Sequence, residues 1–434
     1  MKEFISSIKS SEVYSKIATG AFWSILGTFI SKLIVLVAGI VCANLLGPKG
    51  YGELGIIRST INMFVIFGTA GMGVTATKFI SQYRKNNIEK VGTIFAISNI
   101  FTFISGFVIS LFVIIFSPGV SEILNEPELC FSIRFGGLLL FFSIVNGCYN
   151  GSLLGYENFK SLAINTFGSS LIEAVFVVAG AYWGGVAGAL IGYGIGIMSL
   201  TVFNKFSVHK LFKASGVMPN YSNLHIGDFK VLYQFSLPAA LSSFIVVPSY
   251  WIARALLANH SGFEEVGMYE AAEQWRTIIL FIPSALSNII LPMLSGYQSL
   301  NDSHSYKKTF YCNLLLNVSV SALVAAIVIL FSGLILDVYG QGFDNRLTFI
   351  ILACSTVFSS FSTVVGVTII SKGRAWQGLC FNMIWSLTFI GLTYLFINNG
   401  MGSSGISLAC LIAYFFHSVY QFTYLLVDRQ RSKI

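Results

Sequence analysis

Long apolar stretches alternate with short polar connections along nearly the whole chain. Twelve such stretches can be marked, at residues 17–45, 51–72, 91–116, 131–154, 158–181, 184–204, 229–257, 266–292, 309–335, 347–371, 375–397 and 403–427. Each is long enough, at about 1.5 Å per residue of helix, to cross a hydrocarbon core roughly 30 Å thick. The pattern predicts an all-α polytopic membrane protein of about twelve transmembrane helices. Kinks are expected in the seventh and eighth stretches, which contain Pro238, Pro248, Pro283 and Pro292.

The composition excludes a water-soluble domain. Of the 434 residues, 55% are hydrophobic and 10% are charged, and the mean hydropathy is +0.76, whereas a soluble domain carries about 25% charged residues. The net charge of +8 is expected to reflect membrane topology and not nucleic-acid binding. The seven cysteines show no CxxC or other metal-ligand spacing, so neither a metal nor a cofactor is expected.

The distribution of Lys and Arg among the connections predicts the orientation. With twelve spans, nineteen Lys and Arg residues fall in connections on one side of the membrane and three on the other. Cytoplasmic connections carry the excess of Lys and Arg in membrane proteins. Both termini are therefore expected in the cytoplasm.

Weak internal similarity indicates a duplicated chain. At an offset of 214, Phe67, Ser81 and Tyr83 match Phe281, Ser295 and Tyr297; at an offset of 217, Asn165, Gly185 and Gly188 match Asn382, Gly402 and Gly405. An even number of spans per half predicts two parallel six-helix bundles around a central cavity, at residues 1–208 and 229–434, joined by a cytoplasmic linker at 209–228. Generic similarity among Gly-rich membrane helices is the alternative explanation.

Seven ionisable residues fall inside the predicted spans: Lys32, Arg58, Glu173, Arg254, Glu270, Glu273 and Arg276. Such residues are costly in a membrane and usually face a cavity or a partner. Lys32 lies near the middle of the first span, too deep for its amine to reach the interface comfortably. Arg58 and Arg254 lie closer to the predicted periplasmic side, where snorkelling to the interface is an alternative.

The four cations suit an anionic substrate head group. Arg matches a phosphate through two parallel hydrogen bonds and Lys acts as a point charge, so Lys32, Arg58, Arg254 and Arg276 are candidate substrate ligands. Aromatic residues lie nearby in the sequence and are candidates for stacking on sugar rings or for anchoring at the interface: Trp23, Tyr250, Trp251, Tyr269 and Trp275. Of these, Tyr269 and Trp275 join the predicted substrate site.

The eighth span places Glu270, Glu273 and Arg276 near one helical face, at i, i+3 and i+6. Two interpretations stay open: a wet face along a translocation path, or a local Glu273–Arg276 pair that stabilises a kinked helix. The acids Glu173, Glu270 and Glu273 are also candidates for coupling transport to H⁺ or Na⁺.

Three segments resemble a known family. Residues 43–52, ANLLGPKGYG, resemble the L-G-P-x-x-Y-G turn between the first two helices of polysaccharide transporters. Residues 71–81, GMGVTATKFIS, and residues 155–159, GYENF, resemble two further parts of these proteins. The chain is similar over its whole length to O-antigen flippases of the Wzx type, in the multidrug/oligosaccharidyl-lipid/polysaccharide exporter superfamily.

The resemblance implies a multi-pass protein of the bacterial inner membrane. It implies two bundles arranged as a V that move undecaprenyl-diphosphate-linked oligosaccharide repeat units from the cytoplasmic to the periplasmic leaflet by alternating access. A cation-coupled multidrug exporter of the same superfamily is the first alternative, although such exporters usually have an acid in an early helix where this chain offers Lys32. A membrane enzyme of polysaccharide assembly is the second, although no GxSxG, HExxH or P-loop pattern occurs in a plausible place. We therefore expect a transporter and not an enzyme.

Overall fold

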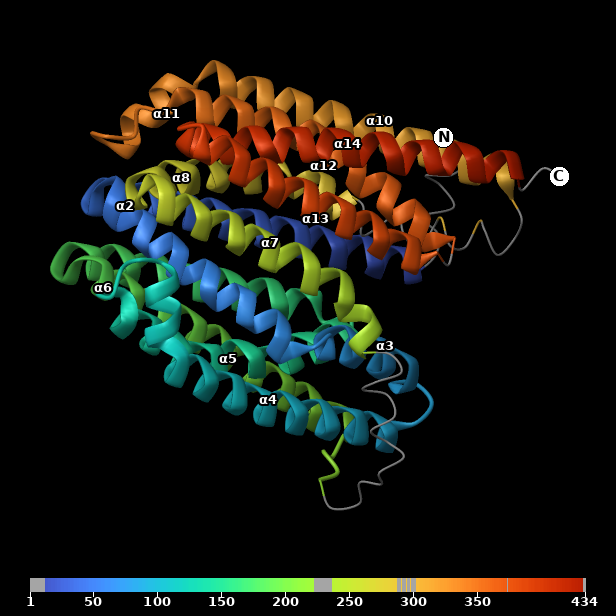
Figure 1. Ribbon diagram of the computed structural model, residues 1–434. Coiled ribbons are helices and arrows are strands. Elements are labelled where there is room, and N and C mark those ends of the chain that lie inside the picture. The colour runs from blue at the N-terminus through green and yellow to red at the C-terminus, as the bar shows by residue number, and fades with distance from the viewer. Residues whose placement is uncertain are drawn as a thin grey trace. The chain divides into compact units, whose positions relative to one another are not determined.

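The computed structural model describes residues 12–221, 236–286, 302–372 and 374–431, together with Ile290, Leu294 and Tyr297. The predicted all-α class is confirmed, because the secondary structure of these residues is helical and the helices are joined by short connections (Figure 1). The helices are α2 (Glu12–Thr69), α3 (Met72–Tyr83), α4 (Ile88–Ile123), α5 (Leu129–Gly155), α6 (Phe159–Ser215), α7 (Leu237–Ser261), α8 (Phe263–Ile279), α10 (Ser303–Leu330), α11 (Ser332–Tyr339), α12 (Arg346–Ser371), α13 (Ala375–Asn398) and α14 (Gly402–Arg431).

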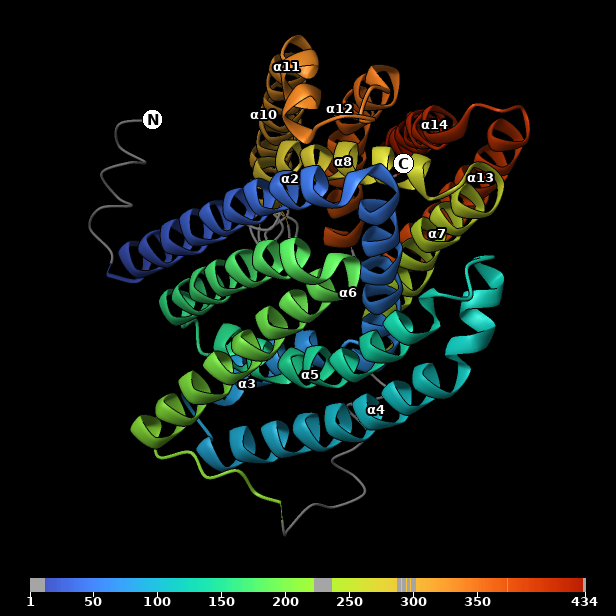
Figure 2. The ribbon, with the colours of Figure 1, turned by 90° about the vertical axis from the view of Figure 1, so that its left-hand side faces the viewer.

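Two of these helices, α2 and α6, each contain a turn at which the backbone leaves the helical conformation. In α2 the turn is at Gly47, which has φ 69° and ψ 175° and is followed by Pro48; Figure 2 shows the sharp change of direction. In α6 it is at Gly184 and Gly185, and Gly185 has φ 57° and ψ −140°. Glycine has no Cβ and tolerates positive φ at little cost. The first turn falls between the predicted spans 17–45 and 51–72, and the second falls on the first two residues of the predicted span 184–204.

Eight helices of the described part are long and apolar enough to cross a membrane. Two of them, α2 and α6, each cover two of the predicted spans. The eighth predicted span is interrupted as expected: α8 ends at Ile279, with Leu280 as its C-terminal cap. Pro283 explains this end, because proline lacks an N–H and its ring clashes with the carbonyl four residues earlier, at Ile279. Pro292 lies outside the described residues, and the number of twelve crossings stays a prediction.

The chain forms two compact units. The first contains Met1–Ala38, Ile61–Val120 and Cys130–Ala240, and the second contains Gly39–Thr60, Ser121–Leu129 and Leu241–Ile434. The segment Gly39–Thr60, around the turn of α2, therefore belongs to the same unit as the C-terminal helices. The predicted division at 208 and 229 did not anticipate this exchange of segments, and its boundaries stay a prediction.

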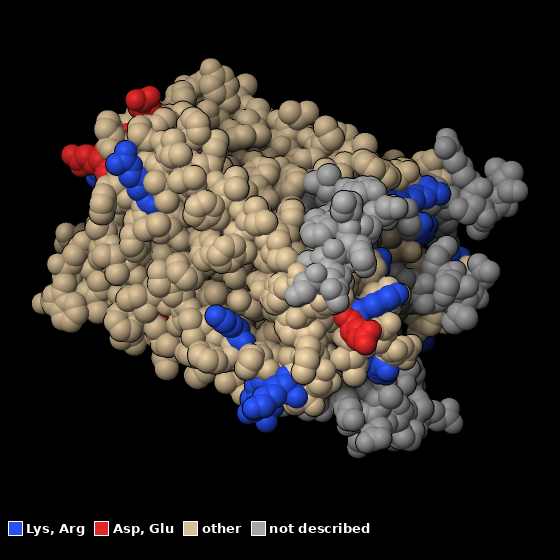
Figure 3. Space-filling view, turned by 90° about the horizontal axis from the view of Figure 1, so that it is seen from below, with Lys and Arg blue, Asp and Glu red and all other residues tan. Residues whose placement is uncertain are grey.

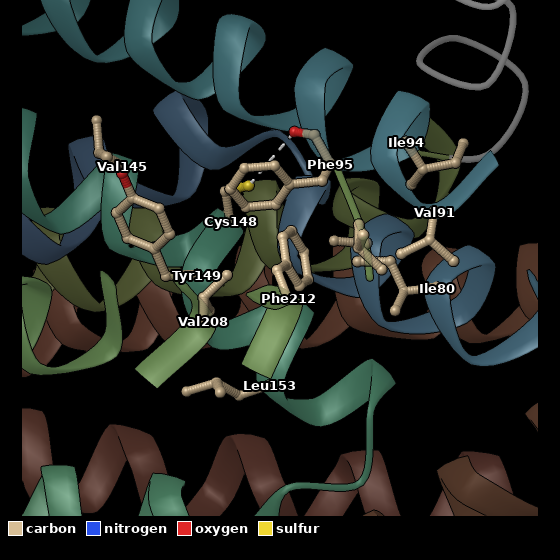
Figure 4. Packing of buried hydrophobic residues seen from close by; sticks show 12 residues of the cluster. Ile80, Val91, Ile94, Phe95, Val145, Cys148, Tyr149, Leu153, Val208 and Phe212 are labelled. Atoms are coloured by element: carbon tan, nitrogen blue, oxygen red, sulfur yellow. Dashed lines mark hydrogen bonds between the residues drawn. The ribbon is translucent and has the colours of Figure 1, made fainter. Parts of the chain in front are cut away.

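A buried apolar cluster holds one end of the first unit together. It takes side chains from α3, α4, α5 and α6, with Phe95 and Phe212 edge to face at a centroid distance of 4.8 Å (Figure 4). Cys148 is fully buried there and its thiol points to the carbonyl of Phe95. The packing fixes the spacing of four helix ends in this unit.

The outer face of α4 is apolar and exposed. Phe103, Phe107, Leu111 and Ile115 are each exposed to between 45% and 59%, and their four-residue spacing puts them along one stripe of the helix. Figure 3 shows a broad area of one face that carries no charged side chain. Such a surface is incompatible with water and is typical of a helix in contact with lipid.

The same arginine–serine hydrogen bond occurs once in each unit. In the first unit, Nε of Arg134 at the start of α5 donates to Oγ of Ser117 at 2.9 Å. In the second, Nε of Arg346 at the start of α12 donates to Oγ of Ser332 at 2.8 Å. Both serines also donate to the carbonyl three residues earlier. The same contact between equivalent helices of the two halves supports the duplication inferred from the sequence.

Glycines bring α2 and α8 into close contact within the second unit. A Cβ at Gly52 would lie 2.0 Å from the carbonyl oxygen of Phe263, and one at Gly267 would lie 2.0 Å from that of Pro48. A Cβ at Gly55 would lie 2.4 Å from Cγ of Glu270. Small residues permit this backbone approach in membrane helices. The contact positions the face of α8 that carries the predicted site.

Candidate functional site

Most predicted site residues lie in the second unit. Arg254 lies on α7 and the α8 residues are Tyr269, Glu270, Glu273, Trp275 and Arg276. Arg58 belongs to the same unit, on the part of α2 that follows Gly55 by one turn. Lys32 and Glu173 belong to the first unit, on α2 and α6.

Arg276 lies at the centre of a buried polar cluster. Its Nη1 donates to Oε1 of Glu273 at 2.7 Å, and its Nη2 donates to the hydroxyls of Tyr250 at 2.8 Å and Tyr414 at 3.5 Å. The guanidinium carbon lies 5.4 Å and 5.6 Å from the centroids of these two rings, within the range of cation–π attraction. Arg276 is 7% exposed. The guanidinium is therefore held between two tyrosines and one carboxylate.

Arg254 forms a second pair in the same unit. Its Nε donates to Oε1 of Glu270, and its guanidinium carbon lies 5.2 Å from the ring centroid of Tyr269. Nη1 of Arg254 also donates to the carbonyl of Tyr250 at 3.3 Å, which links this pair to the Arg276 cluster. Arg254 is 8% exposed. Buried arginines need such partners, since an uncompensated buried charge costs several kcal/mol, roughly 3–5 when one partner is removed.

The two pairs bear on the alternatives left open by the sequence. The local Glu273–Arg276 pair is present, and Glu270 is paired with Arg254 on the neighbouring helix. Two candidate substrate ligands are thus neutralised by two candidate ion carriers. Substrate binding and ion coupling at these four residues stay predictions, and each would require an ion pair to open.

Trp275 joins α8 to α11. Its indole Nε1 donates to the hydroxyl of Tyr339 at 3.1 Å. That hydroxyl in turn donates to Oε1 of Gln274 at 2.9 Å. Burial raises the pKa of the Tyr339 phenol above its usual value, so the phenol stays a neutral donor. Trp275 is therefore engaged in contacts within the second unit, and both sugar stacking and anchoring at the interface stay predictions.

Lys32 differs from Arg254 and Arg276, which are each paired with a carboxylate. It is half-buried on α2, and among the residues that the structure describes it forms no ion pair. The preceding part of α2 packs tightly on α6, since a Cβ at Gly27 would lie 2.6 Å from Cβ of Ala163. Glu173, on α6, packs against Gly196, where an added Cβ would lie 2.6 Å from Cβ of Glu173. The role of Lys32 as a substrate ligand therefore stays a prediction.

Sequence analysis missed a polar face of α14. Ser403, Ser407, Cys410, His417 and Gln421 are buried there, and Tyr414 between them is half-buried. Their spacing of three and four residues marks one face of a helix, and this regular polar stripe is the signal that would have found them. Near Tyr414 and His417 lies Trp385 of α13, which is 1% exposed. In the described part of the chain, no group of three or more His, Cys, Asp or Glu side chains is arranged to hold a metal ion.

Comparison with known proteins identifies the family. The model of the family described as "Polysaccharide biosynthesis protein" matches residues 17–298, well over half of the chain. A putative O-antigen transporter of Shigella flexneri is 25% identical over 337 residues, which are 76% of this chain and 78% of that protein. The lipid III flippase of Escherichia coli is 24% identical over 289 residues, covering 64% of this chain and 67% of the flippase.

A third relative matches over a shorter stretch. It is the EPS I polysaccharide export inner membrane protein EpsE of Ralstonia nicotianae, with 24% identity over 193 residues. The matched part spans 43% of the length of that relative and 43% of this chain. These relatives are described by transport or export and not by catalysis, in agreement with the expectation of a transporter.

Solved structures share the fold. A multidrug resistance MATE family transporter of the MOP superfamily, in an inward-facing conformation, has a TM-score of 0.79 at 16% identity, over 93% of this chain and 95% of that one. A MOP superfamily transporter from Pyrococcus furiosus has a TM-score of 0.71 at 16% identity, over 96% of each chain. The resemblance stated from sequence is confirmed at this level. The chain belongs to the polysaccharide biosynthesis protein family and has the fold of a MOP-superfamily membrane transporter.

Proposed function

We propose that this protein is a flippase for lipid-linked oligosaccharides, moving an undecaprenyl-diphosphate-linked repeat unit from the cytoplasmic to the periplasmic leaflet by alternating access. The family match over residues 17–298 and the transporter fold support this class of activity. The relatives described as an O-antigen transporter and a lipid III flippase support a lipid-linked glycan as the cargo.

The observation that carries the proposal is the lone charge of Lys32. A lysine near the middle of a membrane span costs about 2.5–3.5 kcal/mol on insertion scales, and in the described part of the chain no carboxylate offsets it. An anionic cargo would supply the missing countercharge during transport. A cationic drug would be repelled by the same amine, which disfavours the multidrug-exporter alternative.

Each predicted ligand has a distinct part in this proposal. Lys32 attracts the diphosphate as a point charge, and Arg58 adds a planar donor that can bind two phosphate oxygens. Arg254 and Arg276 are already bound to carboxylates, so they accept phosphate only by exchanging one oxyanion for another. Such an exchange keeps each guanidinium neutralised, and it leaves the displaced carboxylate in need of a new partner or of a proton.

Tyr269 and Trp275 can stack on sugar rings only after their present contacts are released. Tyr269 is fully buried beside Arg254, and Trp275 is bound to Tyr339. Stacking of sugar rings on them therefore requires a state in which these contacts are released. An H⁺ or Na⁺ gradient acting through Glu173, Glu270 or Glu273 belongs to the same proposal, and the ion pairs of Glu270 and Glu273 make those two acids poor carriers.

The test replaces Lys32 in cells that depend on this protein for glycan export. Lys32→Met keeps the side-chain length and removes the charge, and loss of one charge-assisted contact of roughly 1.5–3 kcal/mol predicts about a 10- to 150-fold loss of export. Lys32→Arg should recover part of the activity. Lys210→Met, at an exposed position on α6, is the matched control and should export normally at the same protein level.

Wild-type export by Lys32→Met, at wild-type abundance in the membrane, would overturn the role of Lys32 as the anion ligand. A gain of resistance to cationic dyes in the same variant would favour the exporter alternative, because the repelling charge is gone.

A further inference from the structure

The last turns of α6 carry basic side chains on an exposed flank of the helix. Lys205, His209 and Lys213 are exposed and follow one another at intervals of four residues. Residues four apart lie one above the other on a helix, with Cβ atoms about 5–6 Å apart. We define these three residues as the basic ridge. Lys210 is also exposed, but at about 100° per residue it points roughly 100° away from His209, on the neighbouring ridge.

The level of the basic ridge relative to the bilayer follows from α4. The large exposed apolar side chains of α4 run from Phe103 to Ile123, and the next one towards the start of the helix is Ile88. At about 1.5 Å per residue, the band from Phe103 to Ile123 is about 30 Å long, which is the thickness of a hydrocarbon core. Phe103 therefore marks one boundary of the hydrocarbon, on the side that the charge distribution predicts to be cytoplasmic.

Contacts with α5 extend this boundary to α6. The ring centroids of Phe103 and Phe141 are 5.1 Å apart, and the hydroxyl of Thr201 on α6 donates to the carbonyl of Phe142 at 3.2 Å. Thr201 therefore lies close to the level of Phe103. Lys205 follows one turn later, about 6 Å further along the helix, and the interfacial region extends about 5–8 Å beyond the hydrocarbon on each side. The basic ridge thus begins at the level of the lipid head groups.

The end of α6 leaves the hydrocarbon beside the start of α4. The rings of Phe95 and Phe212, one from each helix, meet at a centroid distance of 4.8 Å, and Figure 2 shows the two helix ends next to each other. In an α-helix each Cα–Cβ bond tilts towards the N-terminus, which at this end of α6 is the direction of the membrane. The long stems of Lys205 and Lys213 can therefore bring their ammonium groups back towards the interface.

Apolar side chains lie next to the basic ridge. Val202 and Phe206, on the neighbouring ridge of α6, are 44% and 69% exposed. They fall at or just beyond the boundary that Thr201 marks, so acyl chains of a lipid can cover them. A lipid with a charged head group matches this combination of an apolar surface and basic side chains at one level.

The basic ridge is held in place by the other side of α6. Val208 and Phe212 are buried in the apolar cluster of Figure 4, and the N–H of Gly216, which ends the helix with φ 68°, donates to the carbonyl of Phe212. Within the described ranges, no carboxylate forms an ion pair with the basic ridge. A set of donors on a fixed helix loses little conformational freedom when it binds an anion.

We propose that the basic ridge binds the phosphate group of an anionic phospholipid of the phosphatidylglycerol class, in the leaflet predicted to be cytoplasmic. Lys205 and Lys213 supply positive charge and His209 supplies a ring N–H donor. Basic residues next to a membrane helix attract anionic lipids in general, whereas this proposal assigns the binding to one ridge and not to Lys210. The ligand is a lipid of the surrounding membrane and not the cargo, so the proposal does not depend on the proposed function.

The test measures which phospholipids stay bound to the purified full-length protein. The protein in a neutral detergent is mixed with phosphatidylglycerol or phosphatidylcholine of the same acyl chains, and mass spectrometry of the intact protein gives the affinity for each. The wild type should bind phosphatidylglycerol more tightly. An attraction of about fivefold per lysine predicts that Lys205→Met with Lys213→Met loses about 10- to 30-fold in affinity for phosphatidylglycerol. Lys205→Arg with Lys213→Arg keeps both charges and should retain most of the affinity, which protects the test against misfolding.

The matched control removes the same charge from other positions of the first unit. Lys85→Met with Lys210→Met neutralises two exposed lysines, one between α3 and α4 and one on the neighbouring ridge of α6, and should keep the wild-type affinity. Equal losses in the two methionine double variants would overturn the proposal, because general charge attraction would then suffice. Unchanged affinity in Lys205→Met with Lys213→Met would also overturn it. Tighter binding of a polyprenyl diphosphate than of phosphatidylglycerol, lost in the same variant, would assign the basic ridge to the cargo and would overturn it as well.

Discussion

The Arg276–Glu273 pair permits a quantitative test of how the second unit is held together. Arg276 is 7% exposed, its Nη1 lies 2.7 Å from Glu273, and two tyrosine hydroxyls complete its contacts. Arg276→Met would leave the carboxylate of Glu273 buried without a cation. Its Oε2 already lacks a hydrogen-bond partner among the described residues, and the neighbouring Arg254 is bound to Glu270. Breaking a buried pair in this way costs about 3–5 kcal/mol.

Removal of both partners should cost much less. In Arg276→Met with Glu273→Met, no charge is left behind, and the hydroxyls of Tyr250 and Tyr414 keep their mutual hydrogen bond at 2.9 Å. Replacement of a buried ion pair by apolar side chains is often neutral or stabilising. We therefore expect a coupling energy of roughly 2–3 kcal/mol between the two substitutions, at the upper end of the range for residues in contact.

The assay uses the protein's own cysteines. Cys42, Cys148 and Cys410 are buried, so a thiol-reactive dye reports unfolding of the purified protein on heating. The matched control is the cycle Lys49→Met with Glu53→Gln, at a pair 3.9 Å apart whose side chains are 58% and 18% exposed. Its coupling should be below about 1 kcal/mol. Additive losses at Arg276 and Glu273, equal to those of the control, would refute the reasoning.

Two further predictions concern packing and pH. Gly267→Ala places a Cβ 2.0 Å from the carbonyl of Pro48, and overpacking of about 1–3 kcal/mol should lower the melting temperature by several degrees; Gly333→Ala, with open space around its Cβ, is the control, and equal melting of both variants would contradict the close contact of α2 and α8. Asp302 caps α10, and hydrogen bonds from Ser305 hold the pKa of its carboxyl below the usual value, so its contribution to stability is complete above the unfolded pKa and is lost as the pH falls through the lowered one. Asp302→Asn, which keeps a capping oxygen, should lose less stability than the wild type between about pH 6 and about pH 3, and equal losses would contradict the assignment.

The secondary structure was largely predictable because bilayer thickness and backbone chemistry are strict constraints. The apolar pattern located the turns at Gly47 and Gly185, and Pro283 located the end of α8. The internal sequence match also corresponds to a shared backbone conformation, since Gly185 and its match Gly402 both have positive φ, at 57° and 52°. These features depend on local sequence, and the sequence therefore determines them.

The partners of the charged residues were not predictable in the same way. The spacing of Glu273 and Arg276 allowed a local pair, but the partner of Glu270 lies on another helix, at Arg254. Only tertiary packing selects such a contact. The assignment of Gly39–Thr60 to the second unit has the same origin, because it follows from close contacts between helices that are far apart in the chain.

The polar face of α14, which contains Ser403, Ser407, Cys410, Tyr414, His417 and Gln421, is present in the sequence pattern but was not recognised. The regular spacing of polar residues on α14 includes His417, which is neutral at pH 7 and so does not stand out in a search for charges within spans. Partly polar stripes on apolar helices therefore merit the same attention as isolated Lys, Arg, Asp and Glu residues.

The central claim is that this chain carries an anionic, lipid-linked glycan with the help of the positive charge of Lys32. The most direct measurement reconstitutes the purified protein in vesicles and follows a fluorescent polyprenyl-diphosphate oligosaccharide from one leaflet to the other. The account predicts protein-dependent movement that falls at least about tenfold in Lys32→Met and not in Lys210→Met. Movement of a cationic dye instead of the diphosphate lipid, or equal rates for the two variants, would contradict it.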